Sequence, residues 1–519
     1  MDNVSSMAML PSMNELSFSY DALAGNRVAY YVGAAALIIT AWSLQSKKKA
    51  PHIEVPFYKA SKLKWIFDAE TLIKHSYDKF KDAIYQIKAT EGVQVLVPPK
   101  YIGEMKSLPE DVLSATEAVA DALQSKYTKF SAGHNGELLT LMLRGRLTQN
   151  LARLQPQLKE ELDYITTTEF PACDDWTPVK WIPFAVRAVS RLSGRAFVGP
   201  SICRDEKWMD TSTNFAVHVF MACVKLQFFP EWARPFAQYL VSDLSKIRRD
   251  FAQARELLQP ILEQRYSFAK DKSSNTGEAP DDMVQWLIEA LPEEEKGDLQ
   301  TQAELQLIVA AAAIHTTNNL LFECMCDLAA NQDIQEELRQ EAYQILVVEG
   351  GWSKKESIPK LKKLDSFMRE VHRLRGSITS FIRKVMKPIS LSDGTHLPAG
   401  TKVLAPLAGI SMDERFFDNA AQFDPWRFYN LRQQSDADNH RWQFTSLSDT
   451  SIQFGAGRHA CPGRFLAGHM IKLILAQFIL NYDIRLKPGQ KRPEPMAMVM
   501  TKAPSPTTEF EFKRRSCDI

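Results

Sequence analysis

The chain has 519 residues, of which 45% are hydrophobic and 24% charged, the balance of an ordinary globular protein. This length suits two average domains or one large helical domain. The formal net charge is +1, and Lys and Arg are spread without an interleaved aromatic stripe, so the composition excludes a nucleic-acid-binding class.

The first predicted element is a membrane anchor at residues 28–44, a run without a single charge. As a helix it would be about 25 Å long, close to the hydrocarbon thickness of a thin bilayer. Lysines occupy positions 47–49, and basic flanks stay cytosolic, so the 1–27 segment is predicted to be lumenal and the body cytosolic. A buried core helix is the alternative for the same run.

This topology predicts a single-pass protein of the endoplasmic reticulum membrane. Asn3 then begins a lumenal Asn-x-Ser sequon, which is a weak glycosylation motif. Residues 45–60 are predicted to form a basic linker containing two prolines, and residues 61–519 a large cytosolic domain.

The body is predicted to be mainly α with small β-sheets. Apolar residues recur at helical spacing over most of 61–387, and strand signals are short and late. A hairpin is predicted in 389–407, and further small strands in 481–486 and 507–515. Residues 270–282 and 433–449 are interpreted as solvated loops, the second long enough to be a functional insert.

The stretch 453–468, "QFGAGRHACPGRFLAG", contains two incompatible signatures. Gly455, Gly457 and Ala460 have the spacing of a dinucleotide-binding loop, and Asp483 follows at a suitable distance. That fold needs its loop early in a series of βαβ units, and the chain shows no such alternation. The preceding residues 450–454 are also too polar for a buried parallel strand.

The other signature is a thiolate site. Seven cysteines are too few and too scattered for a disulfide framework, and that usage fits a reducing compartment. Cys461 precedes a helix-like run, where unpaired backbone amides stabilise a thiolate. Gly463 lets a flat group approach the backbone, and Arg458 and His459 supply donors for anionic groups at the edge of a cofactor. An inert thiol is the alternative for an isolated cysteine.

Two further motifs lie on predicted helices. Glu370 and Arg373 are three residues apart and so share one helical face, where they can pair. In "AAAAIHTTNNLL", Thr316 can bond back to the carbonyl of Ala312 and bend the helix. A solvated ion pair and ordinary packing are the respective alternatives.

Together these residues resemble the cytochromes P450, whose heme-binding signature is F-x-x-G-x-R-x-C-x-G. It is matched at Phe454, Gly457, Cys461 and Gly463, while His459 stands in the place of arginine, as in filamentous-fungal members. The resemblance implies the cytochrome P450 fold behind a single N-terminal transmembrane helix, with heme b as cofactor and Cys461 as its axial thiolate.

The resemblance also implies roles for other residues. Glu370, Arg373 and Arg427 would form a buried charge network around the heme, and Arg383 would contact a heme propionate. Thr316 would position a water for proton delivery, with His315 in the place of the family's acid. The family's W-x-x-x-R helix has no tryptophan here, and Arg144 or Arg146 is expected to do its work.

The function implied is a fungal heme-thiolate monooxygenase that uses O2 and electrons from NADPH–cytochrome P450 reductase. An apolar secondary metabolite, terpenoid or meroterpenoid, is the expected substrate, and residues 218–236 resemble a lid near the membrane. Two alternatives remain: a heme-thiolate isomerase or dehydratase that needs no external electrons, and a heme-free membrane interaction protein.

Overall fold

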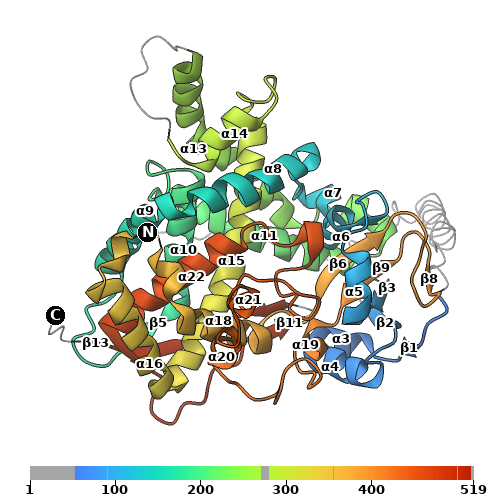
Figure 1. Cartoon of the computed structure of the whole chain (residues 1–519). Coiled ribbons are helices and arrows are strands. Elements are labelled where there is room, and N and C mark those ends of the chain that lie inside the picture. The colour runs from blue at the N-terminus through green and yellow to red at the C-terminus, as the bar shows by residue number, and fades with distance from the viewer. Residues whose placement is uncertain (1–52, 90–91, 271–279, 355, 499–500, 516–519) are drawn as a thin grey trace, which may run out of the picture.

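A computed structural model describes residues 53–89, 92–270, 280–354, 356–498 and 501–515 (Figure 1). The predicted anchor at 28–44, Asn3 and most of the 270–282 loop therefore lie outside the described residues. The described part is mainly helical with small sheets, which confirms the predicted fold class.

The helices are α3 (Lys62–Phe67), α4 (Ala69–Lys79), α5 (Pro99–Met105), α6 (Ala115–Ala122), α7 (Ser125–Thr128), α8 (Gly136–Met142), α9 (Thr148–Glu169), α10 (Trp181–Phe197), α11 (Glu206–Gln227), α12 (Arg234–Ala237), α13 (Ser242–Lys270), α14 (Met283–Ala290), α15 (Leu299–Ala330), α16 (Gln332–Ala342), α17 (Ser357–Lys360), α18 (Lys362–Arg375), α19 (Leu407–Ile410), α20 (Arg427–Arg432), α21 (Asp436–Arg441) and α22 (Arg464–Asn481). Short 3₁₀ turns are η1 (Gly133–Asn135), η3 (Glu231–Ala233), η5 (Gly351–Ser353) and η6 (Gly457–His459), and π turns are η2 (Leu143–Leu147) and η4 (Tyr343–Val348).

Helix α15 is the centre of the fold and packs against α10, α11, α13, α18 and α22 (Figure 1). Its N-terminus is capped by Asp298, whose side chain accepts from the N–H groups of Gln300 and Thr301. A helix that is apolar on most sides must be buried. Among the described helices α15 alone has the length and composition to cross a membrane, and 72% of its apolar window is buried, as in a core helix.

The largest sheet has six strands in the order β1-β2-β3-β9-β6-β4, and a second has the order β10-β13-β5. Two hairpins, β7-β8 and β11-β12, complete the strands. Their bounds are β1 (Phe57–Tyr58), β2 (Tyr85–Ala89), β3 (Gly92–Leu96), β4 (Leu113–Ser114), β5 (Thr177–Lys180), β6 (Ser380–Val385), β7 (Ile389–Ser390), β8 (His396–Leu397), β9 (Lys402–Ala405), β10 (Tyr482–Arg485), β11 (Met496–Met498), β12 (Thr501–Ala503) and β13 (Glu509–Arg514).

The predicted hairpin at 389–407 and the late strands are confirmed, since β7 pairs with β8 and β10 with β13. The expectation that strands occur only late is wrong. β2 and β3 lie near the start of the body, and β3 pairs in parallel with β9, from Gln94 with Lys402 to Leu96 with Leu404. A strand whose partner is about three hundred residues away carries no local turn signal.

The interpretation of 433–449 as a loop is wrong in part, because α21 lies within it. Ser435 caps this helix by accepting from the N–H of Asp438 at 3.2 Å. The stretch 450–454, by contrast, forms no strand, which removes the support for a dinucleotide loop.

Candidate active site

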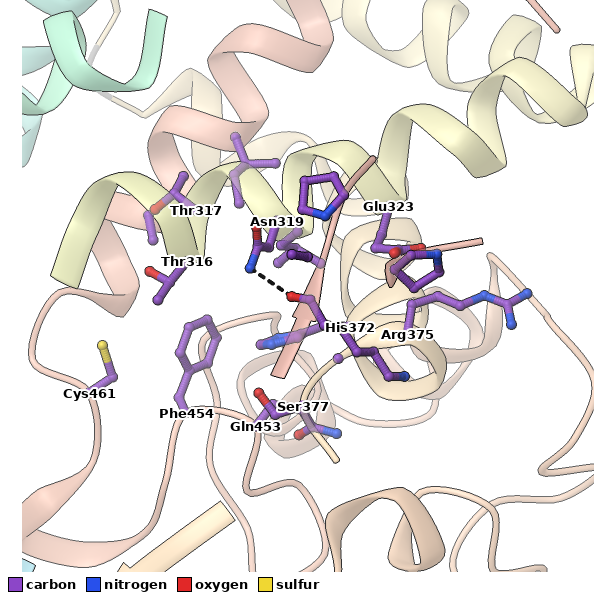
Figure 2. Close-up of a pocket in the computed structure, with 18 of the residues that line it drawn as sticks. Thr316, Thr317, Asn319, Glu323, His372, Arg375, Ser377, Gln453, Phe454 and Cys461 are labelled. Atoms are coloured by element: carbon purple, nitrogen blue, oxygen red, sulfur yellow. Dashed lines mark hydrogen bonds between the residues drawn. The ribbon is translucent and has the colours of Figure 1, made fainter. Parts of the chain in front are cut away.

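A cavity of about 560 Å³ lies between α15 and the loop that carries Cys461. Figure 2 shows the sulfur of Cys461 and the side chain of Thr316 facing the same space. Ala312 and Thr316 line it from α15, and Ala467 from α22. These three side chains are small or short, which leaves room between α15 and the start of α22 for a flat group.

The Cys461 loop is held by its own backbone. The N–H of Cys461 donates to the carbonyl of Phe454 at 2.7 Å, and α22 begins three residues later. Gly457 has a φ of +63°, and a Cβ there would lie 2.3 Å from the carbonyl oxygen of Lys106. Only glycine can occupy that position, because both the left-handed conformation and the close approach exclude a side chain.

Cys461 is the one cysteine of the described chain that is partly exposed; the other described cysteines are buried. Burial raises the pKa of its thiol, while the N–H groups of Gly463 and Arg464 and the charge of Arg464 act in the opposite direction. A bound cation would complete the stabilisation of the thiolate, as in metal–thiolate sites.

One basic side chain from η2 binds the backbone of the Cys461 loop. Arg144 donates to the carbonyls of Arg458 and Ala460, the second at 3.2 Å, whereas Arg146 pairs with Glu289. Of the two arginines considered from the sequence, Arg144 is therefore the one beside the cysteine loop.

The two basic residues of the loop itself face different partners. The Nε2 atom of His459 lies 2.8 Å from a carboxylate oxygen of Glu110, and burial lowers the pKa of this imidazole. Arg458 donates to the carbonyl of Ser107 at 3.3 Å. Glu110 is a partner that the sequence did not reveal, because it lies about 350 residues earlier.

The surroundings of Arg383 on β6 show whether an anionic cofactor would fit beside the cysteine loop. Its guanidinium is buried and donates to the carbonyls of Ile382 (2.8 Å) and Ala456 (3.4 Å). Burial lowers its pKa to about 10, the charge of Glu110 acts in the opposite direction, and no carboxylate among the described residues lies within ion-pair distance of it. A buried cation beside the cysteine loop without a contacting carboxylate fits a heme propionate.

Glu370, Arg373 and Arg427 meet in the structure. Glu370 is fully buried and accepts from Arg373 at 2.7 and 2.8 Å and from Arg427 at 3.3 Å. Arg373 also donates to the carbonyls of Ser411 and Ala420. The network thus ties α18 to the segment that leads toward the cysteine loop.

On α15, the hydroxyl of Thr316 donates to the carbonyl of Ala312 at 2.6 Å. The next residue back, His315, points to α11, where its Nε2 lies 2.9 Å from the carbonyl oxygen of Thr213. Thr316 lines the cavity and His315 does not.

Three aromatic rings form one wall of the cavity, and two of them, His372 and Phe444, were not among the site residues predicted from the sequence. Phe454 contacts Phe444 and His372, with ring centroids 5.2 and 5.0 Å apart. His372 lies inside the Glu370–Arg373 spacing, so the motif could have pointed to it. Phe444 lies in the stretch interpreted as a loop, where no periodicity marks a buried ring.

The chain is similar in sequence to known proteins. A family model described as cytochrome P450 matches residues 191–512. The cytochrome P450 monooxygenase braC of Annulohypoxylon truncatum is 34% identical over 93% of this chain and 97% of its own. Cytochrome P450 monooxygenase prx8 of Penicillium rubens is 32% identical (99% and 94%), and the ent-kaurene oxidase of Fusarium fujikuroi is 30% identical (88% and 85%).

Proposed function

The chain belongs to the cytochrome P450 family of oxidoreductases. We propose that it is a membrane-anchored monooxygenase whose substrate is an apolar secondary metabolite of the terpenoid or meroterpenoid class. The family uses heme bound to a cysteine thiolate, together with O2 and a redox partner. Heme supplies the activation of O2 when it is bound. The residues of this chain would hold that group and deliver protons.

Heme b would be ligated by Cys461, with Phe454 packed beside it and Gly457 and Gly463 allowing close approach. Arg383 and His459 would face its propionates, with Arg458 nearby and Arg144 bonded to the backbone of the loop. The observation that carries this proposal is the single sulfur facing Thr316 across the cavity, with the buried Arg383 guanidinium beside the same loop.

Proton delivery is proposed to run through Thr316. Its hydroxyl lines the cavity and is held in one orientation by donating to the Ala312 carbonyl, so its oxygen can accept a hydrogen bond from a water and orient it there. For His315, a bond from Nε2–H to the Thr213 carbonyl leaves Nδ1 as the nitrogen able to relay a proton.

The proposed electron donor is NADPH–cytochrome P450 reductase at the endoplasmic reticulum membrane. Membrane association is supported by a run of exposed apolar side chains between α11 and α13: Phe228, Phe236, Tyr239 and Leu240. The ent-kaurene oxidase relative supports the proposed terpenoid class of substrate.

A carbon monoxide difference spectrum of reduced membranes tests the cofactor, since heme–thiolate gives a red-shifted band and a heme-free protein gives none. Incubation of candidate substrates with the reductase under ¹⁸O2 tests the reaction: one labelled atom in the product is expected. Turnover without reductase and without label would instead indicate an isomerase or dehydratase.

A further inference from the structure

A second buried charge cluster lies beside the cavity, separate from the Glu370 network. Its carboxylate is Asp365 on α18, and its cations are Lys472 on α22 and Arg432 at the end of α20, all at most 8% exposed. One oxygen of Asp365 lies 2.5 Å from the Lys472 ammonium, and the other lies 3.1 Å from the Arg432 guanidinium. The carboxylate therefore joins three elements that are far apart in the chain.

The same carboxylate also holds the cavity wall. Its second oxygen accepts the backbone N–H of Phe444 at 2.7 Å. The Phe444 ring contacts His372 and Phe454, with centroids 5.7 and 5.2 Å apart. On the α22 side there is no spare room, because a Cβ at Gly468 would lie 3.0 Å from the Phe444 ring.

Helix α22 links this cluster to Cys461. At its start, Arg464 donates to the carbonyl of Cys461 at 2.9 Å and to that of Thr445 at 3.1 Å. Lys472 lies about two turns further along the same helix. The 444–445 segment is thus held at Phe444 by Asp365 and at Thr445 by Arg464, and α22 is held at both places.

We propose that Asp365 is a positioning residue for the thiolate: by holding Lys472 and the Phe444 N–H, it sets α22, and with it Cys461, against the aromatic wall of the cavity. The inference rests on the proposed heme–thiolate function. Removing the carboxylate leaves two buried cations without their carboxylate partner, which favours displacement of α22.

The experiment compares Asp365→Ala with Asp282→Ala in the full-length protein, expressed in cells that are supplied with heme. Asp282 is a matched control because it is also buried (2% exposed, against 6% for Asp365) and pairs with Arg265 of α13, but it lies at the N-cap of α14, away from the Cys461 loop. The readouts are the thermal unfolding midpoint and the rate at which the thiolate band of the reduced carbon monoxide complex converts to the non-thiolate band on mild warming.

Both variants should unfold at lower temperature, but only Asp365→Ala should speed the loss of the thiolate band, on the order of tenfold. Asp365→Glu, which keeps the charge, should restore most of the band's persistence. Equal persistence in Asp365→Ala and the parent, or equal acceleration in Asp282→Ala, would overturn the proposal.

Lys472→Met decides the matter if Asp365→Ala fails to fold. It keeps the bonds of Asp365 to Arg432 and Phe444 but releases α22, so the thiolate band should again convert faster than in the parent. An unchanged rate in Lys472→Met contradicts the positioning role. A parent protein with no thiolate band would contradict the proposed function itself, which is a different result.

Discussion

The hydroxyl of Thr316 and the carbonyl oxygen of Ala312 are 2.6 Å apart, one turn of α15 from each other, at the wall of the cavity that Cys461 faces. The helix stays continuous from Leu299 to Ala330 through this point. The carbonyl of Ala312 is thus engaged by a side chain, and the Thr316 oxygen lies at the cavity wall where it can accept a hydrogen bond from a water.

Thr316→Ala should uncouple electron use from oxidation. The methyl group cannot orient a water, so product formed per NADPH consumed should fall several-fold and peroxide release should rise, with heme content unchanged. Thr316→Ser, which keeps the hydroxyl, is the matched control and should stay close to the parent. Parent-like coupling in Thr316→Ala contradicts the relay.

Substitutions of His315 distinguish, in the same assay, a role in proton relay from a purely structural role. If it relays protons, His315→Ala should lower coupling more weakly than Thr316→Ala does, and His315→Asp should restore it. If it serves only to bond α11 through the Thr213 carbonyl, His315→Gln should restore coupling and His315→Asp should not, since a carboxylate cannot donate to that carbonyl.

Cys461→Ala should abolish the thiolate band, because among the described cysteines no other sulfur faces the cavity. Cys326→Ala on α15 is the control: this thiol is fully buried, so its loss should affect stability and leave the spectrum unchanged. The carbon monoxide difference spectrum distinguishes them. A parent-like band in Cys461→Ala would contradict the ligand assignment.

Acid should destabilise the protein partly through His469 on α22. Burial lowers the pKa of this imidazole to about 3, with the Lys472 charge acting in the same direction, against about 6.5 when unfolded. The unfolded state therefore binds the proton first, so stability is full above pH 6.5 and falls as the pH drops below it. At pH 5 the loss from this residue should be about 2 kcal/mol.

Urea unfolding at pH 7 and pH 5 measures this effect. His469→Leu should lose less stability between the two pH values than the parent, because leucine binds no proton. An equal loss in both proteins would mean that other groups account for the acid sensitivity.

Deletion of residues 1–46 should release much of the protein from membranes with heme binding intact, if 28–44 is the anchor. Any remaining attachment is expected to come from Phe228, Phe236 and Leu240, which are 82, 67 and 78% exposed. Their replacement by serine in the truncated protein should release the rest, as measured by flotation with vesicles. The same replacement at Leu141 and Val348, each 59% exposed, is the control.

The residues around Cys461 could be predicted from the sequence because the chemistry is local. The cysteine, the start of α22 and the glycines of the loop all lie within about a dozen positions. The positive φ of Gly457 explains why glycine is required at that position. The same holds for Glu370 and Arg373, which one helical turn brings together, and for the back-bond of Thr316.

The tertiary structure decided which distant groups meet. The partners of His459, His315 and Asp365 lie on segments from about seventy to about three hundred and fifty residues away in the chain. Strand β3 likewise pairs with β9, about three hundred residues later. Hydrophobic periodicity indicates which face of a helix is buried but not against what. The sequence therefore determined the cysteine loop and the helical class. Only the tertiary structure showed that Arg144 rather than Arg146 contacts that loop, that His315 bonds to α11, and that a charge cluster forms at Asp365. Each of these depends on contacts between elements that are distant in the chain, and no local sequence pattern indicates such contacts.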